Sequence, residues 1–292
     1  MERENSSELP SNTPKIIFLS KDPLIQFQAQ RLVETVAKQG IFEALGYSAY
    51  VRYPNLNKRD SAQAVEIDFA QAVKFISEKS AQRMTALTKE TLYWENIARQ
   101  ICTKQNIQKV RDICGPIIPE TVEIGVVDYA VSGDCSGGKL SILSKGAHSD
   151  LKIPKRSDSQ NIRLFIHEFL AHLCTYELRQ KTVIPEDIRN VYQKAHQNAK
   201  LALLLQNSKE LLMNLLTAEY LLAFNLEQSF THQLLGARFP PTKLKNSILS
   251  AFYKEKPFQN KANRKQLLRH PGNIQRVIEQ VDMEILRFIQ KS

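Results

Sequence analysis

The chain has 292 residues, of which 42% are hydrophobic and 24% are charged, and its formal net charge is +10 at pH 7. A chain of this length and composition can bury a core in one large domain or two smaller ones, as globular proteins do. It contains no run of about 18 apolar residues, so no transmembrane helix is predicted. The polar N-terminus lacks the apolar segment of a secretory signal peptide. We therefore expect a cytoplasmic protein, or one delivered to another cell's cytosol without a classical signal peptide.

The charge and the cysteines narrow the class of protein further. The positive charges are spread along the chain, and the densest groups, at 152–156 and 260–270, contain no aromatic residues. This pattern predicts no nucleic-acid-binding module, although a basic protein suits acidic polypeptide partners. The four cysteines (Cys102, Cys114, Cys135 and Cys174) are widely spaced and form no CxxC pair, which predicts neither a disulfide framework nor a structural zinc knuckle.

The first 115 residues are predicted to form a mainly helical part that packs on the core. Residues 1–14 are expected to be a disordered lead-in to this part. Hydrophobic periodicity predicts strands at 15–20 and 47–54 and amphipathic helices at 22–45, 60–84 and 88–102. The breaker segment GPIIPE at 115–120 marks the boundary between this part, 15–115, and a core at 116–292.

The core is expected to begin with a small antiparallel sheet. Strand-like segments at 121–131 and 138–144 are joined by SGDCSGG, which is typical of a β-hairpin. A helix follows at 162–178, and further helix starts are predicted at Pro185 and at NSKE, 207–210, where Asn207 precedes Glu210 by three residues as in an N-cap. The expected fold class is therefore α+β and predominantly helical.

The helix at 162–178 carries His167, Glu168 and His172 as HExxxH, one residue longer than the HExxH motif of zinc peptidases. In a regular α-helix, residues five positions apart point about 140° away from each other. A π-bulge widens the turn to about 4.4 residues and returns both imidazoles to one face. An ionised glutamate among apolar neighbours is costly unless it is paired or faces a metal-bound water. The motif therefore predicts a metal site, provided that the helix is locally widened.

A catalytic zinc needs three protein ligands and an open position. Between Glu210 and Glu227 the only charged residue is Glu219, in the apolar segment LLTAEYLLAF. A lone carboxylate in such a segment indicates a bound cation, so Glu219 is the predicted third ligand. His196 and Glu177 are reserve candidates, and the alternative for Glu219 is a place at the solvent edge of its helix.

These motifs resemble the HExxxH metallopeptidases related to the microtubule-associated tubulin tyrosine carboxypeptidases, whose bacterial relatives are the flavohaemoglobin-expression-modulating QEGLA-motif proteins. HEFLAHLCT at 167–175 is similar to the zinc-binding helix of that family. TAEYLLA at 217–223 is similar to its Q-E-G-L-A segment, whose glutamate is the third zinc ligand, although Tyr220 stands in place of the glycine and Ala218 in place of the glutamine. The resemblance is confined to the core.

The resemblance implies a zincin-like metallopeptidase core in which His167, His172 and Glu219 bind Zn²⁺. Glu168 would be the general base, and peptide bonds would be hydrolysed by a metal-activated water. Such a metallocarboxypeptidase would act on peptide or protein substrates such as the acidic C-terminal tails of tubulin. The strand at 139–144 would present an exposed edge along which substrate binds.

Removal of C-terminal residues would also require a cation that binds the terminal carboxylate. Six basic residues lie near the motif in sequence: Lys145, Lys152, Lys155, Arg156, Arg163 and Arg179. Two other functions stay open at this point. One is a cysteine hydrolase that uses Cys135 with His148 or His167, and the other is a non-enzymatic basic adaptor protein.

Overall fold

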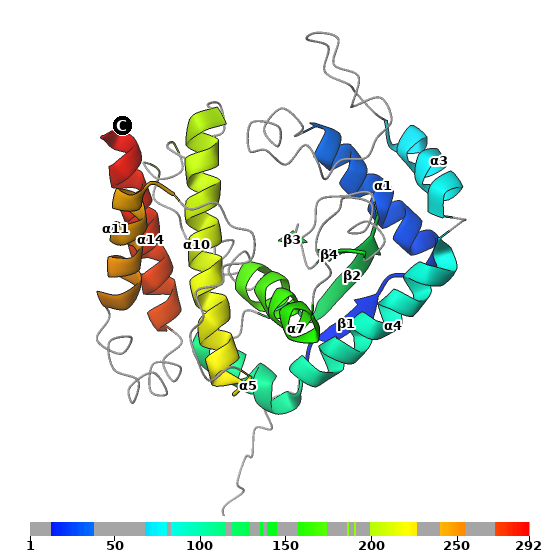
Figure 1. Ribbon diagram of the computed structural model, residues 1–292, viewed down its shortest axis with the longest axis horizontal. Helices are drawn as coiled ribbons and strands as arrows, with labels where there is room; N and C mark the ends of the chain where they lie inside the picture. Colours follow the sequence, from blue (N-terminus) through cyan, green and yellow to red (C-terminus); the bar gives the residue numbers. More distant parts are fainter. Residues whose placement is uncertain are drawn as a thin grey trace, which may run out of the picture.

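The computed structural model describes residues 13–37, 68–80, 83–114, 118–128, 135–136, 139–144, 157–173, 199–226, 240–254 and 272–291, with positions 186 and 190. Over these residues the protein is predominantly helical around one small sheet (Figure 1), which confirms the helical part of the predicted fold class. The predicted strand at 47–54 and residues 1–12 of the predicted lead-in lie outside the described residues. None of the described helices combines the length and the apolarity needed to cross a membrane.

The sheet has the strand order β1-β2-β4-β3 and is mainly parallel. β1 (Lys15–Phe18), β2 (Thr121–Val127) and β4 (Lys139–Leu143) run in the same direction, and the two-residue β3 (Cys135–Ser136) is antiparallel to β4. The predicted antiparallel sheet is therefore wrong. SGDCSGG, 132–138, contains β3 itself, and β4 lies in the sheet between β3 and β2. The reversal thus occurs one strand later than expected.

β1 lies in the same sheet as the strands of the predicted core. Lys15 pairs with Thr121 and Phe18 with Ile124, in parallel register. The breaker segment at 115–120 therefore separates two stretches of the chain that contribute to a single sheet. The main hydrophobic cluster likewise contains residues from both stretches, among them Trp94 and Phe165.

One face of β2 is covered by α1 (Lys21–Ala37), and the two approach closely at a glycine. A Cβ atom on Gly125 would lie 2.5 Å from two ring carbons of Phe27 and 3.4 Å from a methyl carbon of Leu24. Any larger residue at this position would require the Phe27 ring to move, so glycine permits the close approach of β2 and α1. α3 (Phe69–Ser80) packs on α1 through a separate small cluster of Ala29, Leu32, Ala72 and Ile76.

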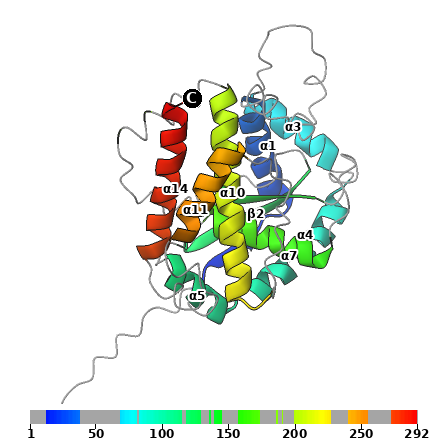
Figure 2. The same cartoon turned by 60° about the vertical axis from the view of Figure 1, so that its left-hand side comes forward.

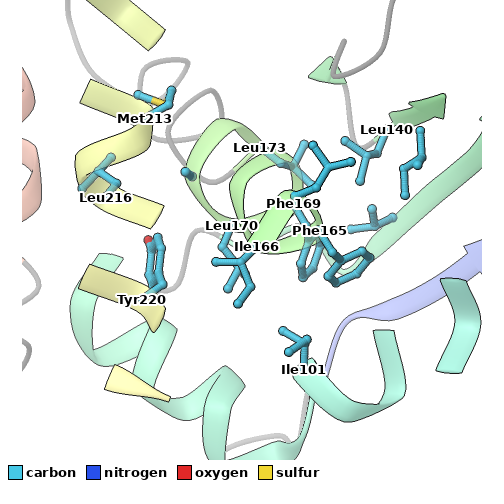
Figure 3. Packing of buried hydrophobic residues seen from close by; sticks show 14 of the residues in the cluster. Ile101, Leu140, Phe165, Ile166, Phe169, Leu170, Leu173, Met213, Leu216 and Tyr220 are labelled. Carbon is cyan, nitrogen blue, oxygen red and sulfur yellow. The ribbon is translucent and has the colours of Figure 1, made fainter. Parts of the chain in front are cut away.

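The other face of the sheet is covered by the motif helix, which consists of α7 (Asp158–Ile166) and η2 (His167–Leu173). Side chains alternate along a strand, so Ile124 points away from Gly125 and shares a face with its register partner Leu140. Figure 3 shows Phe165 and Phe169 on the side of the motif helix that faces Leu140. Burial of these residues against the sheet orients the motif helix about its own axis.

The remaining helices are α4 (Met84–Ile101), α5 (Lys104–Cys114), α10 (Ala199–Ala223), α11 (Thr242–Lys254) and α14 (Gly272–Gln290). α10 lies between the motif helix and the α11–α14 pair (Figures 1 and 2). Met213, Leu216 and Tyr220 lie along α10 beside the motif helix in Figure 3. α10 is thus the second element that can contribute residues to a site on that helix.

The helix start predicted at NSKE, 207–210, is wrong, because α10 is continuous from Ala199 to Ala223. The hydroxyl of Ser208 donates to the backbone carbonyl of Leu204 at 2.8 Å, one turn back. A serine satisfied in this way can stay inside a helix, so the polar segment does not interrupt α10. The correction matters for the site, since it moves Glu210 from a helix end to the middle of a buried helix.

Candidate metal centre

The start of the motif helix is anchored at its first turn. Ser157 and Gln160 form a capping box, in which each side chain accepts a hydrogen bond from the backbone N–H of the other residue. The Tyr93 hydroxyl of α4 donates to Asp158 at 2.7 Å and accepts a hydrogen bond from the amide of Asn161 at 2.8 Å. These contacts fix the direction in which the helix runs toward the HExxxH residues.

The winding of the motif helix changes from α to π at His167 and stays π through Leu173. The widened turn predicted from the extra residue of HExxxH is therefore present. The rings of His167 and His172 meet edge to face, with centroids 4.7 Å apart and planes at 79°. Their Nε2 atoms are 3.1 Å apart, so both imidazoles direct the same nitrogen to one point.

α10 brings a carboxylate to the same point. Oε2 of Glu210 lies 3.5 Å from Nε2 of His167, and Oε1 lies 3.6 Å from Nε2 of His172. Gln206, one turn earlier on α10, donates to Oε1 of Glu210 at 3.1 Å and holds the carboxylate in this position. Among the described residues, His167, His172 and Glu210 are the group that could hold a metal ion, and we call them the metal group.

The separations within the metal group fit a single ion. In a tetrahedral site with zinc–ligand bonds of about 2.0–2.1 Å, neighbouring donor atoms lie about 3.4 Å apart. The two Nε2 atoms here are 3.1 Å apart, and each lies 3.5 or 3.6 Å from a different oxygen of the Glu210 carboxylate. Two imidazoles and one carboxylate that leave a fourth position open are a ligand set of catalytic zinc sites. The residues present therefore fit a zinc ion.

The electrostatics of Glu210 agree with a ligand role. Burial by itself raises the pKa of the Glu210 carboxyl, but the charge of His172 and the polar contacts with both imidazoles outweigh burial and bring the pKa well below its usual range. The carboxyl is therefore ionised, as a metal ligand must be. The side chains of His172 and Glu210 are 19% and 18% exposed and that of His167 is 5% exposed, so the metal group opens to solvent on the side of His172 and Glu210.

The structure does not bring Glu219, the predicted third ligand, to the two histidines. Glu219 lies nine residues after Glu210, and nine steps of about 100° place it on roughly the opposite face of α10. It is 4% exposed, so it does not lie at the solvent edge of the helix either. A helix start at NSKE would place Glu210 in a first helical turn, so the sequence pattern does not mark Glu210 as a ligand. The unbroken apolar pattern of α10 was the signal that could have placed Gln206 and Glu210 on one face.

The other predicted site residues are placed as follows. Glu168 directly follows His167 in η2 and is buried. Arg163 is buried in α7, so it is not a surface cation. The reserve ligands Glu177 and His196, the alternative base His148 and the remaining basic candidates Lys145, Lys152, Lys155, Arg156 and Arg179 lie outside the described residues.

The proposed substrate edge and the alternative nucleophile both lie in the sheet. Cys135 is the first residue of β3. β3 pairs with Lys139 and Leu140 of β4, while β2 pairs with β4 along its other side. The edge position predicted for the strand at 139–144 is therefore taken by β3 at the start of that strand, and β3 contacts η2.

Comparisons with known proteins give no information about the function of this protein. A scan against protein-family models finds no match, and no curated protein and no solved structure matches the chain. A functional proposal must therefore be supported by the side chains described above and by the motifs of the sequence.

Proposed function

We propose that the protein is a zinc-dependent peptidase with a zincin-like core, in which His167, His172 and Glu210 hold the metal. The observation that carries the proposal is the convergence of two imidazoles from one π-helical turn and a carboxylate from a separate helix, with donor atoms 3.1 to 3.6 Å apart. A π-helical turn is an uncommon feature that is concentrated at functional sites. Here it is the feature that allows HExxxH to present both histidines together.

The resemblance to the HExxxH metallopeptidases is as compatible with a ligand role for Glu210 as with one for Glu219, and the geometry of the metal group favours Glu210. In that family the glutamate of the Q-E-G-L-A segment is the third ligand. KELLM at 209–213 keeps the glutamate and the leucine two residues later, with Lys209, Leu211 and Met213 at the other positions. In the proposal, Glu210 therefore takes the role that the sequence analysis gave to Glu219.

When bound, zinc would supply a Lewis acid that polarises the scissile carbonyl and makes water more acidic. Glu168 is the general base, which accepts a proton from the attacking water and passes it to the leaving amine. Its place directly after His167 puts it on the same widened turn as both histidines. Glu168 is itself buried, so bulk water has little access to the base.

We propose peptides or proteins as substrates, and acidic C-terminal tails such as those of tubulin as the class to test first. The formal net charge of +10 supports an acidic substrate, because opposite charge speeds association. The resemblance to tubulin tyrosine carboxypeptidases supports cleavage at a C-terminus and action in the cytoplasm.

The test is incubation of wild type and Glu168→Gln with a peptide panel and with tubulin, read by mass spectrometry, together with the zinc content of each purified protein. We expect one zinc per chain in both proteins and a loss of activity of about 10²- to 10⁴-fold in Glu168→Gln. Glu78→Gln, a change of the same kind at an exposed position of α3, should keep full activity.

Three results would contradict the proposal. One is a wild-type protein that binds no zinc, and another is full cleavage activity in Glu168→Gln. The third is activity that is lost on blocking of Cys135 but resists metal chelators, which would favour a cysteine hydrolase.

A further inference from the structure

The second ring nitrogen of His167 faces away from the metal group and meets a hydroxyl. Nδ1 of His167 lies 3.0 Å from Oγ1 of Thr217, which belongs to α10. Thr217 is fully buried and His167 is 4% exposed, so bulk water does not compete for this contact. The same hydroxyl of Thr217 lies 2.7 Å from the backbone carbonyl oxygen of Met213, to which it donates.

The direction of these hydrogen bonds follows from the number of protons. A hydroxyl has one proton, and a carbonyl oxygen can only accept. Since Thr217 donates its proton to Met213, its oxygen can only accept a hydrogen bond from His167. The proton of neutral His167 therefore lies on Nδ1, and the lone pair of Nε2 points toward His172 and Glu210. This is the tautomer that a metal at Nε2 requires.

We infer that Thr217 is a positioning residue, which holds His167 in its metal-binding tautomer and orientation. The inference rests on the proposed function, because it concerns the same metal group. Thr217 follows Glu210 by seven residues, which is about two turns of α-helix, so both lie on one face of α10. One helix thus supplies a ligand and the residue that orients another ligand.

A matched control exists elsewhere in the molecule. Thr91 of α4 is also a buried threonine whose hydroxyl donates to the carbonyl one turn back, that of Leu87, at 2.8 Å. A change of threonine to valine removes the hydroxyl at both positions. Within the described part of the chain, the hydroxyl of Thr217 contacts a histidine, whereas that of Thr91 contacts a backbone carbonyl. A comparison of the two variants therefore separates the loss of a buried hydroxyl from the loss of the contact with His167.

The experiment measures the zinc affinity of the full chain by competition with a chromophoric chelator. The variants are Thr217→Val, Thr217→Ser and Thr91→Val. We expect a loss of about 10- to 100-fold in affinity for Thr217→Val, as for other residues that orient a metal-bound histidine. Thr217→Ser keeps the hydroxyl and should stay close to wild type, and Thr91→Val should bind zinc as wild type does.

A second measurement is the set of ¹⁵N chemical shifts of the His167 ring in the metal-free wild type. We expect a protonated Nδ1 and an unprotonated Nε2. This measurement decides the question even if Thr217→Val fails to fold, because a proton on Nε2 of neutral His167 would overturn the inference.

The outcomes separate this inference from the proposed function. If wild type binds zinc and Thr217→Val binds it equally well, or Thr217→Ser is as weak as Thr217→Val, the role of Thr217 is overturned while the zinc site stands. If wild type binds no zinc, the proposed function itself fails.

Discussion

Two buried polar groups of this protein hold a carboxylate in different ways. In the metal group, Glu210 faces two imidazoles. The second group, which we call the Asp128 group, lies where β2 and β4 end. Asp128 lies 3.3 Å from the guanidinium of Arg83 and accepts a hydrogen bond from the hydroxyl of Ser144. The backbone N–H of Asp128 donates to the side-chain oxygen of Gln28 on α1 at 2.9 Å.

The difference between the two groups lies in the source of the positive charge. The guanidinium of Arg83 stays protonated at any ordinary pH, so the charge of Asp128 is compensated permanently within the fold. An imidazole carries a positive charge only when it is protonated, so the metal group holds no permanent counter-charge for Glu210, and a bound metal ion would supply one. The Asp128 group therefore joins α1 and the start of α4 to the sheet, while the metal group could hold a cation.

The largest expected effect is a difference in zinc affinity between variants of the two glutamates of α10, Glu210 and Glu219. Loss of a residue that orients a metal ligand weakens metal binding by about 10- to 100-fold. Glu210→Gln should weaken zinc binding by more than this, because the ligand itself loses its charge. Glu219→Gln should leave the zinc affinity unchanged, since Glu219 lies on the opposite face of the helix. Chelator competition measures both. Loss of zinc binding in Glu219→Gln with retention in Glu210→Gln would reverse the ligand assignment.

Removal of zinc should destabilise the metal group and leave the Asp128 group intact. At free zinc a hundredfold above the dissociation constant, binding stabilises the native state by about 2.7 kcal/mol, so a chelator should lower the midpoint of thermal unfolding. In Arg83→Gln the zinc-dependent shift should be as large as in wild type. A shift of the same size in Glu210→Gln would show that zinc stabilises the chain at another place.

Removal of the cation from the Asp128 group should cost stability without affecting zinc. Arg83→Gln leaves the side chain of Asp128, which is 0% exposed, as a buried charge. Breaking a buried pair costs about 3–5 kcal/mol, and since Arg83 is 27% exposed we expect a loss of about 2 kcal/mol in urea unfolding of the metal-free protein. Arg99→Gln breaks a surface pair with Glu95 and should cost less than about 0.5 kcal/mol.

Replacement of the acidic partner, Asp128, should lower the free energy of unfolding by less than replacement of Arg83 does. Asp128→Asn keeps an oxygen that can accept the hydrogen bond from Ser144, and Arg83 can turn toward solvent. We expect a loss of about 1 kcal/mol in the free energy of unfolding, measured as for Arg83→Gln. Asp22→Asn, at an exposed position of α1, is the control. An Asp128→Asn variant that is less stable than Arg83→Gln would contradict the view that the buried partner carries the larger penalty.

The sequence by itself determined the features that depend on neighbouring residues. The spacing of His167 and His172 is compatible with a shared face only if the helix widens, and η2 has this winding. The apolar runs that became β2 and β4 were found for the same reason, because burial patterns are set within a few residues. The hairpin predicted from SGDCSGG between the segments at 121–131 and 138–144 is wrong, because β2 and β4 pair in parallel.

Only the tertiary structure decided the features that depend on distant contacts. β2 and β4 pair in parallel, and β3 pairs with the other side of β4. A turn signal in the sequence predicts that the chain reverses, but it does not specify which strand becomes the partner. Glu210 became the third member of the metal group because α10 continues through Ser208 and packs against η2 on the face that carries Glu210 and Thr217. Packing against other elements decides where a helix ends and which of its faces is buried. The predicted ligand Glu219 is isolated among apolar residues in the sequence, but it lies on the opposite side of α10 from Glu210.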